Sequence, residues 1–164
     1  KGTKVAPFLL GGDQERGRRA STQNVAGAVG LAKAVELCGQ RMEHERTHQT
    51  SLRDWLLETV PKMISGVRVN GHLTKRLPNN AHFSFEKIEG EALSMSLDMA
   101  GIAVSMGSAC ASGALEPSHV LRAIGLSDQA ALGALRITLG RWTTAEHIDY
   151  FLEQLQVLVK SLRE

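Results

Sequence analysis

Apolar residues recur at helical spacing through the first third of the chain. From about residue 25 to residue 60 the sequence is rich in Ala, Leu, Glu and Arg, and Pro61 is expected to end this helix. Its apolar positions share one arc of a 3.6-residue helix and predict a stripe that faces a core. The stripe consists of Leu31, Val35, Cys38, Met42, Leu52 and Leu56. Cys38 is therefore expected to be a packed structural residue, and Gly39 marks a place where the helix could bend.

Strands are predicted where short apolar or alternating runs occur. The first run, 5–10, is interrupted by Pro7, and because proline cannot donate to a ladder this run is expected to be an edge strand. The other predicted strands are 67–69, 82–85, 102–105 and 135–139.

Further helices are expected between and after these strands. Residues 89–99 are expected to be a helix ended by Gly101 in a C′ position, and residues 117–124 a helix followed by Gly125, with Pro117 in its first turn. Thr143 and Glu146 form a capping-box pattern for a last helix. That helix is expected to bury Ile148, Phe151, Leu152, Leu155, Val159 and Leu162. The order of elements predicts an α/β fold in which helices cover a sheet.

Composition narrows the class of protein. A length of 164 residues fits one domain, or one domain and a piece of another. With 43% hydrophobic and 22% charged residues, a core can form without disulfides or a metal. No apolar run approaches the roughly 20 residues of a membrane span, and the first residues lack a signal-peptide core. The two cysteines, Cys38 and Cys110, indicate a reducing, cytoplasmic compartment. The net charge of +2 is too small to indicate a nucleic-acid or membrane partner.

Cys110 lies in a run of small residues, GSACASGA at 107–114. Small neighbours cannot pack a core around the thiol, so the sulfur is expected to be reachable from solvent on a mobile loop, where it can react as a thiolate. The alternative is a turn of small residues with an incidental cysteine, since free cysteines are usually buried. The pattern alone leaves both interpretations open.

Arg136 alternates with Leu135 and Ile137 and therefore shares a strand face with Thr138. If that face opens on a cleft, the guanidinium suits a carboxylate held by two parallel hydrogen bonds. The alternative is a surface arginine on a solvated sheet, which composition does not exclude.

A basic, hydroxyl-bearing segment directly precedes the first long helix and contains Arg18, Arg19, Ser21 and Thr22. Free N–H groups, hydroxyls and cations at a helix start form a natural phosphate site. The alternative, slightly favoured by these residues alone, is simple N-capping of the helix by Ser21 or Thr22.

His44 and His48 match the H-E-x-x-H pattern of zinc proteases. Both lie on the flank of the apolar stripe and no third ligand is evident, so a polar helix surface is favoured over a metal site. The remaining histidines have no ligand spacing and receive no role: His72, His82, His119 and His147.

Three segments together resemble the pyridoxal-phosphate-dependent cysteine desulfurases of the nitrogen-fixation and iron–sulfur type. They are GGDQERGRRASTQN at 11–24, SMGSACAS at 105–112 followed by EPSHVL at 116–121, and LRITLGRWTT at 135–144. Their order and separations match across essentially the whole chain, which is far more specific than any one motif.

The resemblance implies the C-terminal part of a fold-type I pyridoxal-phosphate enzyme. Residues 1–40 would be a remnant of the large cofactor-binding domain with the start of the linking helix, and residues 41–164 the small domain. Lys1 and Lys4 do not match the motif of the Schiff-base lysine, which would precede this sequence. The chain by itself is therefore expected to be inactive, because the electron sink is missing.

The resemblance also assigns roles to individual residues. Cys110 would take sulfur from L-cysteine as a persulfide and leave L-alanine, Arg136 would bind the substrate carboxylate, and Thr22 would reach the cofactor phosphate of the partner subunit in a homodimer. The implied sulfur acceptor is an iron–sulfur scaffold protein. No metal site is assigned, although Cys110 could share a cluster with that scaffold. Ser21 stands where the family usually has glycine, which puts the phosphate contact in question, and Met106 stands where serine is usual and is expected to change packing only.

Two alternatives to the desulfurase remain. The chain could be a non-catalytic, severed small domain that serves as a binding or dimerisation module. It could also belong to a related pyridoxal-phosphate lyase, such as a selenocysteine lyase. The glycine- and serine-bearing segment around Cys110 favours the desulfurases.

Overall fold

The computed structural model describes residues 2–12, 14–106 and 117–164. The chain divides into two units, Lys1–Met42 and Glu43–Glu164. The assignment of the first unit to a large cofactor-binding domain stays a prediction.

The first unit contains the short 3-10 helix η1 (Glu15–Gly17) and the beginning of helix α1 (Val25–Met63). The predicted edge strand at 5–10 is wrong, because no strand forms within residues 2–12. A strand needs a neighbour for its N–H and C=O groups, and the described part of this unit supplies only single contacts such as Ala20 N to Leu9 O at 3.2 Å.

Helix α1 extends through Gly39 and two residues beyond Pro61, so the predicted end at Pro61 is slightly wrong. A proline in the last turn removes one backbone donor without preventing the final residues from staying helical. The predicted stripe is buried only in the second unit, at Leu52 and Leu56. In the first unit the stripe is exposed, and Cys38 is exposed as well. The expectation that Cys38 is packed is therefore wrong, since helical periodicity identifies an apolar face but supplies no surface to cover it.

The second unit is built on a three-stranded antiparallel sheet with strand order β1-β2-β3. The strands are β1 (Val67–Val69), β2 (Asn80–Phe85) and β3 (Ala134–Thr138). They confirm the three alternating segments predicted from the sequence. The strand predicted at 102–105 is wrong, because this segment contributes only an isolated bridge between Ser105 and Arg136.

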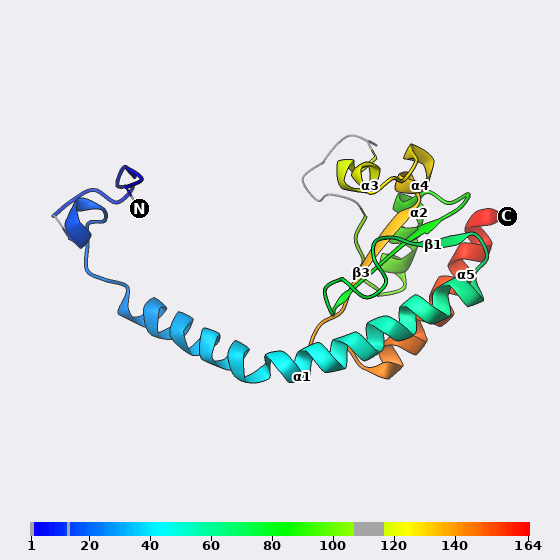
Figure 1. Ribbon diagram of the computed structural model, residues 1–164, viewed down its shortest axis with the longest axis horizontal. Helices are drawn as coiled ribbons and strands as arrows, with labels where there is room; N and C mark the ends of the chain where they lie inside the picture. Colours follow the sequence, from blue (N-terminus) through cyan, green and yellow to red (C-terminus); the bar gives the residue numbers. More distant parts are fainter. Residues whose placement is uncertain (1, 13, 107–116) are drawn as a thin grey trace. The chain divides into compact units, whose positions relative to one another are not determined.

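One face of the sheet carries the main core. Ala81, Phe83 and Phe85 alternate on β2 and are almost fully buried, as are Leu135 and Ile137 on β3. The second part of α1, helix α2 (Gly90–Met99) and helix α5 (Ala145–Arg163) complete this core. Figure 1 shows the second half of α1 running beside α5 along the sheet. Because period-two alternation buries one face, the other face is left to polar side chains.

Two short helices, α3 (His119–Ala123) and α4 (Asp128–Leu132), form a smaller cluster with Ala134 at one end of β3. Helix α4 was not predicted, because five residues are too short for a periodic pattern. Pro117 precedes the N-cap of α3 instead of lying in its first turn.

The last helix confirms five of its six predicted buried residues, whereas Leu162 is only partly buried. Its capping box is shifted by one residue, to Thr144 and His147. Thr143 instead accepts a hydrogen bond from Gly140 N at 3.0 Å. In the described part of the chain, no helix is long and apolar enough to cross a membrane.

Candidate active site

A row of four polar residues crosses the face of the sheet opposite the main core. His82 on β2 is the direct partner of Arg136 on β3. Beyond β3, Ser105 and Arg136 exchange two main-chain hydrogen bonds of 3.1 and 2.7 Å. On the other side, Asn70 N donates to His82 O at 2.8 Å. Asn70, His82, Arg136 and Ser105, the polar row, thus come from four separate segments of the chain.

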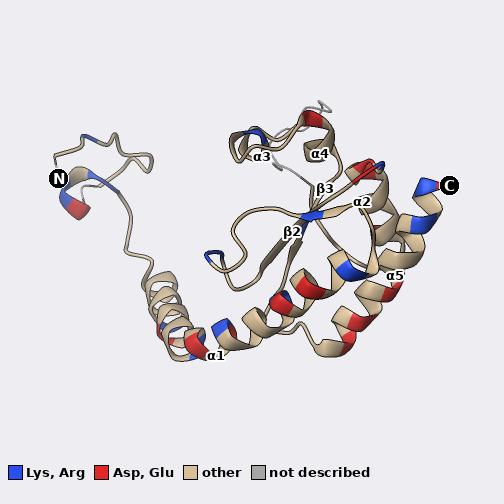
Figure 2. Ribbon diagram, turned by 45° about the vertical axis from the view of Figure 1, so that its right-hand side comes forward, with Lys and Arg blue, Asp and Glu red and all other residues tan. Residues whose placement is uncertain are grey.

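Arg136 carries a positive charge that no carboxylate among the described residues neutralises. Its side chain is half-buried, and Nη2 donates to Ser105 Oγ at 3.1 Å. The strands contain no acidic residue, whereas acidic positions are spread over the helices (Figure 2). A guanidinium has five donors, and the described residues use only one of them, so they leave most of its hydrogen-bonding capacity to an anion. This arrangement is compatible with an anion at the guanidinium, and the assignment of Arg136 to a substrate carboxylate stays a prediction.

His82, the strand partner of Arg136, was not predicted as a site residue from the sequence. Burial, with the nearby charges of Arg136 and Arg76, lowers the pKa of His82 to about 4. The imidazole is consequently neutral at ordinary pH. Alternation with Phe83 and Phe85 could have placed His82 on the polar face, but the strand register that brings it to Arg136 is not readable from local sequence.

Thr22 lies in an exposed segment before α1, and it is not the residue that caps the helix. Asn24 Oδ1 accepts from Gly27 N at 2.9 Å and performs this role. N-capping by Ser21 or Thr22, the favoured alternative, is therefore wrong, because the helix begins two or three residues later than that interpretation requires. The guanidinium of Arg19 donates to the main-chain oxygens of Ser21 and Thr22 at 3.0 and 2.6 Å.

Ser21, which stands where the resemblance implies glycine, has a left-handed backbone conformation. Its φ of 72° is in the left-handed region that glycine adopts without strain. The backbone at Ser21 is therefore one that glycine favours, and it is strained in a residue that carries a Cβ.

The predicted nucleophile, Cys110, lies outside the described residues, so its assignment stays a prediction. Of its neighbours in the motif, Ser105 and Met106 are described, and Ser105 anchors Arg136. A Cβ built on Gly90 would lie 3.4 Å from Met106 Sδ, so Met106 lies close to the start of α2.

The H-E-x-x-H residues dock α1 onto the segment that precedes α5. His48 Nε2 lies 2.8 Å from Thr143 O, and Glu45 pairs with Arg141 at 2.8 Å. These contacts occupy groups that a metal ion would need. In the described ranges, no group of three or more His, Cys, Asp or Glu residues is arranged to hold a metal ion.

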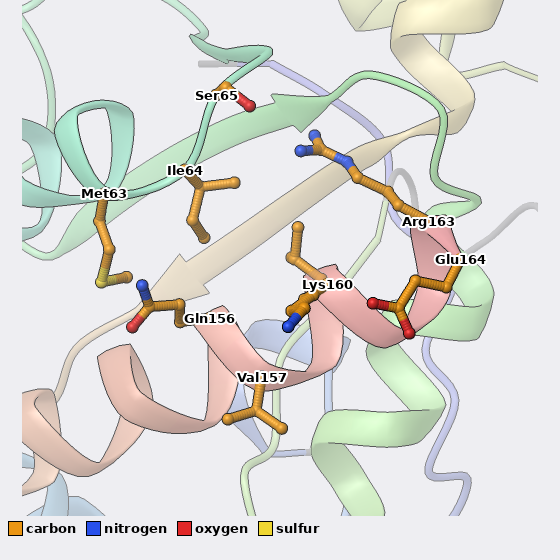
Figure 3. Close-up of a pocket in the computed structure, with 9 residues that line it drawn as sticks. Met63, Ile64, Ser65, Gln156, Val157, Lys160, Arg163 and Glu164 are labelled. Carbon is orange, nitrogen blue, oxygen red and sulfur yellow. The ribbon is translucent and has the colours of Figure 1, made fainter.

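A separate open groove of about 520 Å³ lies where α1 ends beside α5. Figure 3 shows Lys160 and Arg163 on α5 beside Ile64 and Ser65. Arg163 Nε donates to Glu86 O at 3.2 Å. The groove is distinct from the polar row, since Arg136 does not line it.

Comparison with known proteins agrees with the motifs. Residues 4–151 match the Aminotransferase class-V family. The chain is 48% identical over 163 residues to "Cysteine desulfurase IscS" of Dictyoglomus turgidum, covering 99% of this chain and 41% of that protein. It is 47% identical over 163 residues to "Cysteine desulfurase NifS" of Azotobacter vinelandii, covering 99% of this chain and 40% of that protein. The chain thus spans about two fifths of the length of these curated relatives.

Solved structures show the same likeness in three dimensions. A "NIFS-LIKE PROTEIN" superposes with a TM-score of 0.79 at 35% identity, covering 98% of this chain and 40% of that chain. A NifS-like protein from Rickettsia africae gives a TM-score of 0.78 at 25% identity, covering 96% of this chain and 41% of that chain. The predicted α/β fold and the resemblance to the desulfurases are confirmed, and the chain belongs to the class-V aminotransferase family.

Proposed function

We propose that the complete protein containing this chain is a cysteine desulfurase, which converts L-cysteine to L-alanine and leaves sulfur on Cys110 as a persulfide. The observation that carries the proposal is Arg136, a half-buried guanidinium without a carboxylate partner among the described residues. It lies on a strand bridged to Ser105, shortly before Cys110 in the sequence. The relatives named cysteine desulfurase support the same assignment.

Arg136 binds the carboxylate of the amino-acid substrate in this proposal. A guanidinium holds a carboxylate through two parallel, charge-assisted hydrogen bonds, which fix orientation as well as position. Ser105 Oγ accepts from Nη2 and so restricts the side-chain rotamer before substrate arrives. The carboxylate end of the substrate is thereby fixed relative to its thiol.

The residues before α1 fit the phosphate of pyridoxal phosphate. The Thr22 side chain is exposed and is not used as a helix cap, and Arg19 adds a cation beside it. Thr22 would therefore hold the phosphate, in the partner subunit of a homodimer, with Arg19 contributing charge. When bound, pyridoxal phosphate supplies an electron sink next to the substrate Cα.

The Cys110 thiolate attacks the sulfur of the bound substrate. A sulfur–sulfur bond forms to Cys110 while the substrate Cβ–S bond breaks, and the electron pair of that bond stays on Cβ. Cβ then takes a proton and becomes the methyl group of alanine, so the oxidised sulfur remains on Cys110 as a persulfide. The persulfide is passed to an acceptor, proposed to be an iron–sulfur scaffold protein in the cytoplasm.

The test is to load the complete protein with pyridoxal phosphate, add L-cysteine, and measure alanine together with the mass of the Cys110 peptide. One added sulfur on that peptide, in step with alanine formation, is the expected result. Cys38→Ser is the matched control, because Cys38 is the exposed thiol that could accept sulfur instead. Undiminished alanine formation in Cys110→Ala would overturn the assignment of the nucleophile.

A further inference from the structure

His82 and Arg136 face the same side of the sheet. They are direct partners in the antiparallel register of β2 and β3, and side chains of such partners project together with Cβ atoms about 4.5–5.5 Å apart. The imidazole therefore lies beside the guanidinium that is proposed to bind the substrate.

Asn70 fixes the orientation of this imidazole. Asn70 is only 3% exposed, and its Nδ2 lies 3.0 Å from His82 Nδ1 and 2.8 Å from Ser84 Oγ. Exchanging Oδ1 and Nδ2 of Asn70 would bury two N–H donors without acceptors. The observed orientation leaves only Asn70 Oδ1 without a partner among the described residues and is therefore favoured. Nδ1 of His82 is therefore an acceptor, and the proton of the neutral ring is on Nε2.

The Nε2–H group has no hydrogen-bond acceptor within residues 2–12, 14–106 and 117–164. Burial, with the charges of Arg136 and Arg76, lowers the pKa of His82 to about 4, so the ring does not add a repelling charge beside Arg136. Among the described residues, no hydrogen bond from Nε2 is formed. A neutral donor thus lies beside the cation Arg136, whose guanidinium uses one donor within the part of the chain that the structure describes.

The other arginine whose charge acts on His82 is already engaged. Arg76 donates to the main-chain oxygens of His72 at 2.7 Å, Asn70 at 2.7 Å and Asn80 at 3.3 Å. These bonds hold the connection between β1 and β2 and leave Arg76 a structural role. Arg136 has one side-chain partner, Ser105, in the described ranges.

We infer that His82 binds the substrate carboxylate together with Arg136, donating from Nε2–H, and that Asn70 positions the imidazole for this contact. The inference rests on the proposed function and adds a specificity determinant to it. A carboxylate offers about four lone-pair sites, so a third donor fits beside the two of a guanidinium. Recognition of the carboxylate separates cysteine from cysteamine, which has the same thiol and amine but lacks the carboxylate.

The test compares His82→Ala and His82→Gln in the complete, cofactor-loaded protein. The amide nitrogen of glutamine can occupy the place of Nε2, so His82→Gln is expected to keep KM for cysteine within about threefold. His82→Ala is expected to raise this KM about tenfold with kcat nearly unchanged, because a charge-assisted hydrogen bond is lost. His44→Ala, which removes an exposed histidine from α1, is the control.

Arg136→Gln separates the inference from the function on which it rests. If Arg136→Gln raises KM and His82→Ala does not, the role of His82 is overturned and the carboxylate site stands. If neither variant changes KM, the carboxylate site itself is misassigned, and the proposed function loses its main support.

The unmodified protein provides a second measurement, which decides the outcome if His82→Ala does not fold. In protein labelled with ¹⁵N-histidine, His82 is expected to show the Nε2–H tautomer, and saturation with L-alanine, which carries the same carboxylate, should shift its Nε2 resonance. An Nδ1–H tautomer, or a resonance that L-alanine leaves in place, would overturn the inference.

Discussion

Arg136 and Ser105 are joined at three points: two main-chain hydrogen bonds of 3.1 and 2.7 Å and a side-chain hydrogen bond of 3.1 Å from Nη2 to Oγ. The first two bonds fix the position of the Arg136 main chain, and the third orients the guanidinium. This pair therefore connects the proposed carboxylate site to the segment that leads into the Cys110 motif.

Replacement of Arg136 by lysine should not restore the site. Lysine keeps the charge but lacks the planar fork that binds a carboxylate through two bonds. We expect Arg136→Lys and Arg136→Gln to raise KM for cysteine about 10–100-fold, as for loss of about 1.5–3 kcal/mol. Steady-state kinetics of the complete enzyme measure this. Arg76→Lys is the comparison, since Arg76 donates to main-chain oxygens and has no proposed contact with the substrate. A KM of Arg136→Lys equal to that of the unmodified enzyme would contradict the assignment of Arg136.

Removal of the Thr22 hydroxyl should weaken cofactor retention. Valine has the shape of threonine without the donor, so Thr22→Val is expected to raise Kd for pyridoxal phosphate about tenfold. Equilibrium dialysis of the complete protein with pyridoxal phosphate measures the effect. Ser21→Gly is the matched control, because glycine adopts the positive φ of this position without strain and should retain the cofactor. Equal affinity in Thr22→Val and the unmodified protein would exclude Thr22 as a phosphate ligand.

A methyl group at Gly90 should destabilise the second unit. A Cβ there would lie 2.7 Å from Ala134 O and 2.8 Å from Leu132 O, both main-chain atoms that cannot move aside cheaply. We expect Gly90→Ala to lower the free energy of unfolding by about 1–3 kcal/mol. Gly30 lies within α1, and a Cβ built on it would have no neighbour within 4 Å. Gly30→Ala should therefore raise the free energy of unfolding by up to about 1 kcal/mol. Urea unfolding followed by tryptophan fluorescence distinguishes the two; equal midpoints would show that the close approach at Gly90 is relieved.

Because of His82, the free energy of unfolding should decrease as the pH is lowered. Its pKa is about 4 in the folded protein and about 6.5 when unfolded, so above pH 6.5 the ring is neutral in both states and its contribution is fully present. As the pH falls from 6.5 towards 4, the unfolded state takes up a proton that the folded state does not. The free energy of unfolding therefore decreases by about 1–3 kcal/mol. His82→Gln should remove this part of the pH dependence, whereas His44→Gln should retain it. The urea midpoint of each variant, measured between pH 4 and pH 7, gives the slope of stability against pH. Identical slopes in the two variants would contradict the lowered pKa of His82.

Local periodicity by itself determined much of the second unit. The alternation in 82–85 and 135–139 predicted both strands and placed Leu135 on the face opposite Arg136, because in a strand the face of each side chain follows from its position. The buried residues of α5 were predicted for the same reason at helical spacing. Arg136 could therefore be placed on the polar face before any contact was known.

Only the tertiary structure decided which partners these faces meet. The stripe of α1 is buried at Leu56 and exposed at Leu31, since burial needs a second surface as well as an apolar face. His82 joins Arg136 through the strand register, and Asn70 and Ser105 join them from segments far away in the chain. The local sequence determines which face of a strand or helix a side chain lies on. Which strand it pairs with depends on how the backbone hydrogen bonds of the entire chain are satisfied, and no local pattern contains that information.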